Sequence, residues 1–409
     1  MPRTDLLVYN IGELVTFMDG PLARASEERA GIIRGAAVAV RDGRIVDVGE
    51  DSRVRGSYEA REAINAGGLL VTPGLVDPHT HPVFEGSRED ELTLKVQGVP
   101  YSEILARGGG IYRTVRMTRG ASSGRLLELT VKRLNLMLVG GTTTVEAKTG
   151  YGLDPGEELR HLRVLEAAAS RTRQRLVPTL LAHVPPEGVG EADYAGDFAR
   201  NLLPRVASEG LAEYVDVFCD RGAFSVESSR LILAEAMKAG LRARIHADQL
   251  AYIGCSRLAA ELAVDSADHL EKMPPQNARL LAEAGVVAVL TPTSMLSMMD
   301  PSRPPVDSLR EAGAYIAIAS DYNPNNMTPW AQTALQLAPY VLGLTQLEAL
   351  AAATVNAAKS LRLDRVVGRI APGYRADLIV WSVENHKWLG YEWGRDLTLK
   401  VIVRGEIAK

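Results

Sequence analysis

LLVTPGLVDPHTH, residues 69–81, is an apolar, β-branched run that ends in two histidines two positions apart. Such a run predicts a buried strand over Leu69–Val76. Side chains at i and i+2 of an extended chain point to one face, so His79 and His81 can reach the same ion. A pair of hydrogen-bonded turn histidines is the alternative for this motif taken alone.

From this strand to about residue 363, short apolar runs alternate with longer runs of helical period, such as Leu126–Val139 and Glu157–Ala169. This alternation indicates parallel βα units. The expected strands are Leu69–Val76, Thr142–Ala147, Leu176–Ala182, Tyr214–Phe218, Ala243–Ile245, Asp265–Ala267, Val286–Leu290 and Tyr315–Ala319. Eight such strands predict an α/β fold of the (β/α)8 TIM barrel class, with short helices after strands five to seven.

Both ends of the chain favour β structure. Short strands are expected at Leu6–Ile11, Ala36–Arg41 and Ile45–Val48, with a hairpin turn at Asp42-Gly43 between the last two. Near the other end, Ala376–Trp381 and Leu399–Val403 have the same character. We expect the two terminal segments to pair.

The composition is that of an ordinary globular protein. The 409 residues are 46% hydrophobic and 23% charged with a net charge of −4, which excludes a disordered chain and disfavours nucleic acid or anionic lipid as partners. Only Cys219 and Cys255 are present, too few for a disulfide framework and suited to a reducing compartment. With neither a signal peptide pattern nor a membrane-spanning apolar run, a cytoplasmic location is expected.

Metal-capable side chains stand at the ends of several predicted strands. His246 ends one run and Asp321 follows another, in addition to His79 and His81. In a barrel these ends meet at the active-site face. Three imidazoles and one carboxylate suit Zn²⁺ or another borderline divalent ion, although each residue alone could be a buried polar group or a helix cap.

Further polar residues follow other predicted strands. His269 and His183 could orient or polarise a substrate carbonyl, or serve only as hydrogen-bonding neighbours of the ligands. Gln249 carries both a donor and an acceptor that could bind a cyclic amide. His161 and His386 lie outside these positions and are interpreted as surface residues.

Arg88 follows the histidine pair and could grip a substrate carboxylate in a bidentate way, with an internal salt bridge to its acidic neighbours as the alternative. Tyr101 and Tyr151 could supply hydroxyl contacts, although most tyrosines only pack. The Gly108-Gly109-Gly110 run lacks the ending of a phosphate loop and is interpreted as a mobile cover or a helix stop.

Taken together, these motifs resemble the amidohydrolase superfamily and, more narrowly, its imidazolonepropionase family. The resemblance covers practically the whole chain and is specific in combination. It rests on residues 73–81 together with GSREDE (86–91), GGGI (108–111), KTGYGL (148–153), DVFC (216–219), HADQ (246–249), SADHL (266–270), DYNP (321–324) and VIVRG (401–405).

The resemblance implies a distorted (β/α)8 barrel over residues 69–363 and a small composite β-sandwich from residues 1–68 and 364–409. It implies one Zn²⁺ or Fe ion on His79, His81, His246 and Asp321, and hydrolytic ring opening of 4-imidazolone-5-propanoate in a homodimer. The implied catalytic residues are Asp321, His269 and Gln249. The implied substrate contacts are Arg88, Tyr101, Tyr151, His183, Gln249, Asn323, Asn325 and Asn326.

Some positions depart from the family pattern, and other functions stay open. Gln249 stands where many members have Glu, and Asn325-Asn326 where Gly-Ser is usual. A mononuclear deaminase of a purine, pterin or related ring is the nearest rival, but a neutral ring would not need Arg88. A two-metal enzyme is disfavoured because residues 214–220 contain no lysine, which leaves Lys148 as a possible salt-bridge residue. A non-catalytic metal-binding scaffold is disfavoured because no ligand is missing.

Overall fold

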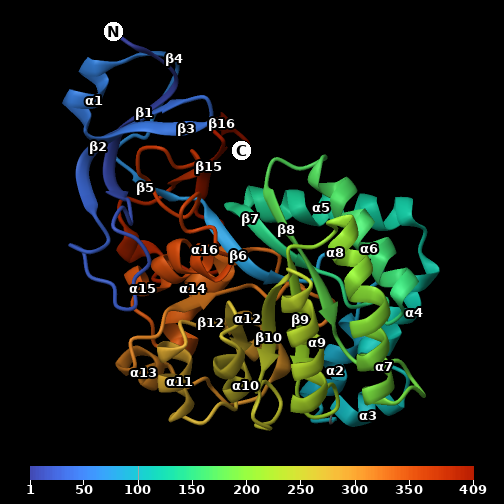
Figure 1. Cartoon of the computed structure of the whole chain (residues 1–409). Coiled ribbons are helices and arrows are strands. Elements are labelled where there is room, and N and C mark those ends of the chain that lie inside the picture. The colour runs from blue at the N-terminus through green and yellow to red at the C-terminus, as the bar shows by residue number, and fades with distance from the viewer. Residues whose placement is uncertain (100) are drawn as a thin grey trace.

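The computed structural model describes residues 1–99 and 101–409, apart from the side chains of Tyr101, Ser102 and Ala106. Two sheets organise the chain, and both termini lie in the upper one, where blue and red segments meet (Figure 1). None of the helices in this described part combines the length and apolar composition needed to cross a bilayer.

The lower sheet is parallel and its strands follow one another in chain order, which confirms the predicted barrel class. Its strands are β6 (Leu75–Thr80), β7 (Thr142–Lys148), β8 (Arg175–Ala182), β9 (Tyr214–Cys219), β10 (Arg242–Ala247), β11 (Ser266–His269), β12 (Val287–Leu290) and β13 (Ile316–Ile318). Most residues of these strands are buried, as expected for a sheet covered by helices, and the partly exposed ones lie mainly in the first half of β8.

The prediction of one strand over Leu69–Val76 is wrong, because this stretch contributes to two strands that lie in two different sheets. β5 (Leu70–Pro73) belongs to the upper sheet, and β6 starts the barrel after Gly74. A Cβ atom at Gly74 would lie only 2.3 Å from Thr143 Oγ1, so the close approach of β7 requires glycine at this crossing.

The barrel closes only at its carboxyl end, which makes it distorted. There the backbone N–H of Asp321 donates to His79 O (3.1 Å), and the N–H of His81 donates to Tyr322 O (2.8 Å). Lower down, the N–H of Val76 donates instead to Ala353 O, beside helix α15 (Gln346–Ala352). The closing hydrogen bonds therefore lie at the predicted metal ligands themselves.

Helices surround the barrel, and those after β10, β11 and β12 are short, as predicted (Figure 1). Besides α15, the helices are α1 (Asp51–Ser57), α2 (Glu89–Val96), α3 (Tyr101–Ala106), α4 (Gly110–Gly120), α5 (Ser123–Val139), α6 (Pro155–Ala169), α7 (Glu191–Asp197), η1 (Phe198–Leu202), α8 (Leu203–Glu209), α9 (Val226–Lys238), α10 (Cys255–Leu262), α11 (Asn277–Glu283), α12 (Pro292–Met298), α13 (Val306–Glu311), α14 (Ala331–Leu342), α16 (Val355–Ser360) and η2 (His386–Trp388).

The upper sheet joins the two ends of the chain. Its remaining strands are β1 (Arg3–Val15), β2 (Ile32–Arg41), β3 (Arg44–Glu50), β4 (Glu59–Asn65), β14 (Leu378–Trp381), β15 (Thr398–Val403) and β16 (Glu406–Ile407). β5 pairs with β1 on one side and β14 on the other, so the predicted pairing of the ends occurs through this strand. Asp42 and Gly43 both have positive φ (51° and 70°), which confirms the hairpin turn.

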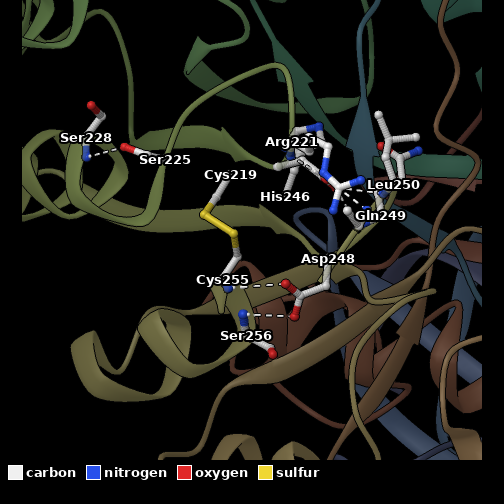
Figure 2. Close-up of a disulfide and its surroundings, with 12 residues drawn as sticks. Cys219, Arg221, Ser225, Ser228, His246, Asp248, Gln249, Leu250, Cys255 and Ser256 are labelled. Atoms are coloured by element: carbon white, nitrogen blue, oxygen red, sulfur yellow. Dashed lines mark hydrogen bonds between the residues drawn. A yellow bond between two sulfur atoms is a disulfide. The ribbon is translucent and has the colours of Figure 1, made fainter. Parts of the chain in front are cut away.

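The two cysteines differ from the expectation of reduced thiols. Cys219 ends β9, Cys255 begins α10, and the structure joins them in a disulfide with the Cα atoms 5.8 Å apart (Figure 2). Because β9 and β10 are adjacent parallel strands, the segments that follow them start side by side despite 36 residues of separation. The reducing-compartment argument therefore loses its support.

The interpretation of His161 and His386 as surface residues is wrong. His386 is buried and its Nδ1 donates to Glu13 Oε1 (2.7 Å), which links η2 to β1. His161 is fully buried in α6, and neither ring nitrogen has a hydrogen-bond partner among the described residues. Burial, reinforced by the charges of Arg160 and Arg119, lowers the pKa of His161 to about 3.

His161 should make folding sensitive to mild acid. Its folded-state pKa lies below the value near 6.5 of the unfolded chain, so below pH 6.5 the unfolded state takes up the proton first and stability falls. We expect the free energy of unfolding, measured in urea, to fall between pH 7 and pH 5. The fall should be about 2 kcal/mol larger for the unmodified chain than for His161→Leu. Equal losses in the two proteins would contradict a neutral buried imidazole.

Candidate active site

The four predicted metal ligands converge at the carboxyl end of the barrel. His79 and His81 lie on and just after β6, His246 lies near the end of β10, and Asp321 follows β13. His79 Nε2 lies 3.3 Å from His81 Nε2, and Asp321 Oδ1 lies 3.6 Å from the first and 3.4 Å from the second. The ring of His246 lies 4.4 Å from that of His79 between centroids.

These donor atoms fit a small divalent ion. Ligand atoms about 2.0–2.1 Å from a tetrahedral ion are separated by about 3.3 Å, which matches the spacing around His79, His81 and Asp321. His79 and His246 also group with His269, each offering a nitrogen within 4.8 Å of the others. Mixed imidazole and carboxylate donors suit Zn²⁺ and Fe²⁺ better than Mg²⁺ or Ca²⁺.

Buried carboxylates hold two of the imidazoles by their far nitrogens. His79 Nδ1 lies 2.6 Å from Asp268 Oδ2, and His246 Nδ1 lies 3.0 Å from Asp216 Oδ2. A carboxylate on Nδ1 fixes the tautomer and directs Nε2 outward as an electron-pair donor. His79 Nε2 therefore faces the shared site. His246 offers one ring nitrogen within 4.8 Å of a nitrogen of His79.

Two buried cations balance these carboxylates. Lys148 Nζ donates to Asp216 Oδ2 (2.6 Å) and to Glu146 Oε1 (2.8 Å). Arg244 NH2 donates to Asp268 Oδ2 (3.1 Å), and all five side chains are fully buried. Burial alone would lower the pKa of Lys148, but Asp216 and Glu146 outweigh it and raise that pKa. Lys148 is thus the salt-bridge residue that the sequence suggested.

Burial keeps His79, His183 and His246 neutral at pH 7, whereas His269 is protonated. Burial lowers the pKa of His79 and of His183 well below their usual value, and lowers that of His246 to about 4 against the opposing effect of Asp216. His269 differs, because its contact with Glu271 and the negative charge there outweigh burial and raise the pKa to about 9. Neutral imidazoles are the form that binds metal.

The backbone is strained where it turns toward the site. Asp321 and His269 have φ of +47° and +79°, a left-handed region that non-glycine residues seldom adopt. His269 Nδ1 lies 3.1 Å from Thr291 Oγ1, which leaves Nε2 for the site. Hydrogen bonding to His81 and the charge of His269 outweigh burial and hold the pKa of Asp321 below its usual range. Such strain at the ends of two barrel strands is typical of functional sites.

A cavity of about 360 Å³ opens above these side chains. Most of the predicted site residues line it, namely His81, Arg88, Tyr151, His183, His246, Gln249, His269, Asp321, Asn323 and Asn325. His79 lies beneath it, fully buried. This volume suits a single small ring with a short side chain.

Tyr101 and Asn326 are the predicted substrate contacts that are not among the described lining residues of the cavity, and Arg88 lines it while also pairing with an acid. The side chain of Tyr101 lies outside the described residues. The Asn326 amide is buried and donates to Ser320 O (2.8 Å) and Asp321 O (3.1 Å), so it fixes the turn that carries Asp321. Arg88 lines the cavity, yet its Nε and NH2 also donate to Glu91 Oε2 (2.9 and 2.8 Å). The internal salt bridge is therefore present, and the bidentate grip of Arg88 on a substrate carboxylate stays a prediction.

Sequence reasoning missed several residues of the site. Arg221, Ser294 and Met298 line the cavity, and Asp216 and Asp268 hold the histidines. Asp216 lies within the predicted strand Tyr214–Phe218, whose other residues are apolar or aromatic, and a charged residue inside a buried strand is the signal that could have found it. Asp268 directly follows the predicted strand Asp265–Ala267. Arg221 comes from a loop, whose course no periodic pattern predicts, and Met298 is the last residue of α12.

We expect Asp268→Ala to weaken metal retention about 10- to 100-fold, because His79 would lose the partner that directs its Nε2. Competition with a chromogenic chelator measures this affinity directly. Thermal unfolding of the metal-free proteins is the control for lost stability. Unchanged metal affinity in a folded variant would contradict the orienting role.

Comparisons with known proteins agree with this geometry. The model of the amidohydrolase family matches residues 70–408. The imidazolonepropionase of Pyrobaculum arsenaticum is 46% identical over 98% of this chain and 99% of its own length. The imidazolonepropionase of Symbiobacterium thermophilum is 42% identical over 100% of this chain and 98% of its own length. That of Bacillus velezensis is 39% identical over 99% of this chain and 97% of its own length.

Solved structures share the fold at low identity. A zinc-bound adenosine deaminase from Xanthomonas campestris has a TM-score of 0.74 and 22% identity over 99% of this chain and 93% of its own. The zinc complex of atrazine chlorohydrolase from Arthrobacter aurescens has a TM-score of 0.71 and 18% identity, over 98% of this chain and 94% of its own. The sequence matches, together with the shared fold, show that the chain belongs to the imidazolonepropionase branch of the amidohydrolase family.

Proposed function

We propose that the protein catalyses hydrolytic ring opening of 4-imidazolone-5-propanoate to N-formimidoyl-L-glutamate. The observation that carries the proposal is the convergence of His79, His81, His246 and Asp321 beneath a cavity lined by Arg88. Identities of 38–46% to imidazolonepropionases over nearly the full length support the same reaction.

The proposed cofactor is one divalent ion, Zn²⁺ or Fe²⁺, held by the three histidines and Asp321. When bound, such an ion lowers the pKa of a coordinated water towards ~7 and polarises the substrate carbonyl. The carboxylate of Asp321, ionised because its pKa is held low, accepts the proton of the attacking water. It then returns this proton to the ring nitrogen as the amide C–N bond breaks.

His269 stabilises the charge that develops on the carbonyl oxygen. Its raised pKa keeps a proton available, and its Nδ1 is engaged with Thr291, so Nε2 donates toward the oxygen. His183, whose Nδ1 donates to Gly150 O (3.1 Å), is likewise oriented with Nε2 free to contact the ring. Gln249 contacts the ring nitrogen or carbonyl through its amide, and it does not act as a carboxylate base.

Arg88 binds the propionate. Glu91 fixes the guanidinium through Nε and NH2, and Glu91 itself accepts the N–H of Gly110 (2.7 Å), so the Gly108–Gly110 turn is tied to this subsite. Tyr151 and Asn323 complete the proposed substrate contacts from the cavity wall. A neutral purine or pterin would not use this cation, which separates the proposal from the deaminase alternative.

The decisive experiment is an assay of the purified, metal-loaded protein with freshly prepared 4-imidazolone-5-propanoate. A panel of aminated purines and pterins and of other cyclic amides runs beside it. We expect formation of N-formimidoyl-L-glutamate. Turnover of an aminated ring without hydrolysis of the imidazolone would overturn the proposal in favour of deamination.

Removal of the ion should abolish turnover. After dialysis against a chelator, we expect activity to fall with metal content and to return on addition of Zn²⁺ or Fe²⁺, because the water would otherwise keep its ordinary pKa. Metal analysis beside the rate measurement checks this expectation. Full activity of metal-free protein would count against the mechanism.

Asp321→Asn should lower kcat about 10²–10⁴-fold, because the amide cannot carry the proton from the attacking water to the leaving ring nitrogen. Metal content of the variant is measured in parallel, because Asp321 is also a proposed ligand. A folded, metal-loaded variant with near-normal kcat would refute the proton-transfer role.

A cytoplasmic location and a homodimer remain predictions. The disulfide removes one argument for the first, and the second rests only on the family resemblance. Size-exclusion chromatography with light scattering measures the oligomeric state.

A further inference from the structure

A second arginine faces the cavity from the opposite side of the barrel mouth. Arg221 follows β9, whereas Arg88 follows β6, and two strands, β8 and β7, lie between these two in the sheet order. Arg221 is exposed, and its guanidinium has no hydrogen bond or ion pair with any described side chain. It is a positive charge at the cavity without an acidic partner.

The two arginines differ in their charge environment. Arg88 is buried and lies 2.8 Å from Glu91, so the pair contributes little net charge to the cavity. The lining side chain with a full negative charge is Asp321, which belongs to the proposed metal site. Arg221 therefore adds, at the mouth of the cavity, a positive charge that no described acidic side chain offsets and that can attract an anion as it enters.

The loop that carries Arg221 is held in place. The carboxylate of Asp220 accepts the backbone N–H of Arg221 (2.7 Å) and those of Gln249 (2.8 Å), Leu250 (2.7 Å) and Ala251 (2.9 Å). The disulfide joins Cys219, which precedes the first of these loops, to Cys255, which follows the second. Figure 2 shows Arg221 on the same side of this disulfide as Gln249 and Leu250.

We propose that Arg221 selects anionic substrates at the mouth of the cavity. Its guanidinium attracts the substrate carboxylate on entry and favours an acid over a neutral molecule of the same shape. This inference rests on the proposed function and adds to it a second residue that determines specificity, besides Arg88. Because the guanidinium is exposed, its effect should weaken as salt screens it.

Arg221→Gln tests the inference, with Arg257→Gln as the matched control. Arg257 lies on α10, is also exposed, has no side-chain partner among the described residues and does not line the cavity. Both variants remove one positive charge. We compare kcat/KM for 4-imidazolone-5-propanoate with that for its propanamide analogue, at low salt and in 0.5 M NaCl.

At low salt, Arg221→Gln should lower the acid-to-amide ratio of kcat/KM about 3- to 10-fold, and salt should shrink this difference. Arg257→Gln should leave the ratio unchanged. If both variants changed the ratio equally, the effect would come from the net charge of the protein and the inference would be overturned. An unchanged ratio in Arg221→Gln would also overturn it.

A binding measurement separates this inference from the proposed function. Calorimetry of the metal-loaded protein with imidazole-4-propanoate, and with its amide, requires no turnover. A weaker affinity of Arg221→Gln for the acid alone supports the inference even if the imidazolone is not hydrolysed. Equal affinities of the unmodified protein and Arg221→Gln for the acid overturn it even if hydrolysis is observed.

Discussion

The site depends on charges that are buried beneath it. Lys148 and Arg244 stand fully inside the barrel and hold Asp216 and Asp268 by short contacts. Two unpaired carboxylates would be too costly to bury, and without them the imidazoles of the site would lack a fixed tautomer. The pairing of these charges thus allows a polar ligand set to exist in a close-packed core. Removal of one partner would leave the other charge buried and uncompensated.

The hydrogen bonds that close the barrel lie at the same residues as the proposed metal site. The first and last strands meet through hydrogen bonds at His79, His81 and the residues after β13, rather than along their length. Asp321 therefore stands at the junction, with its backbone in the left-handed region and Asn326 fixing the turn that follows. Because the proposed ligands lie at this junction, the hydrogen bonds that close the barrel also hold them in place. A site held in this way can orient the substrate without first rearranging its own side chains.

Much of this organisation could be predicted from the sequence. Apolar runs gave the positions of the barrel strands to within a few residues, because buried parallel strands are continuously hydrophobic. The run Leu69–Val76 misled in one point, since its pattern does not reveal that the chain passes between sheets at Gly74. His161 and the two cysteines were misjudged for a related reason: local sequence does not tell which helix face is covered or which loops lie together.

The sequence by itself determined the ligand types and their placement at strand ends, because extended geometry and the shared direction of parallel strands bring those ends to one face. Only the tertiary structure decided which carboxylates hold the histidines, that Glu91 offsets Arg88, and that the guanidinium of Arg221 has no partner among the described side chains. These outcomes depend on distances between residues far apart in the chain. Contacts of that kind follow from how strands and loops pack in space, which no local pattern encodes.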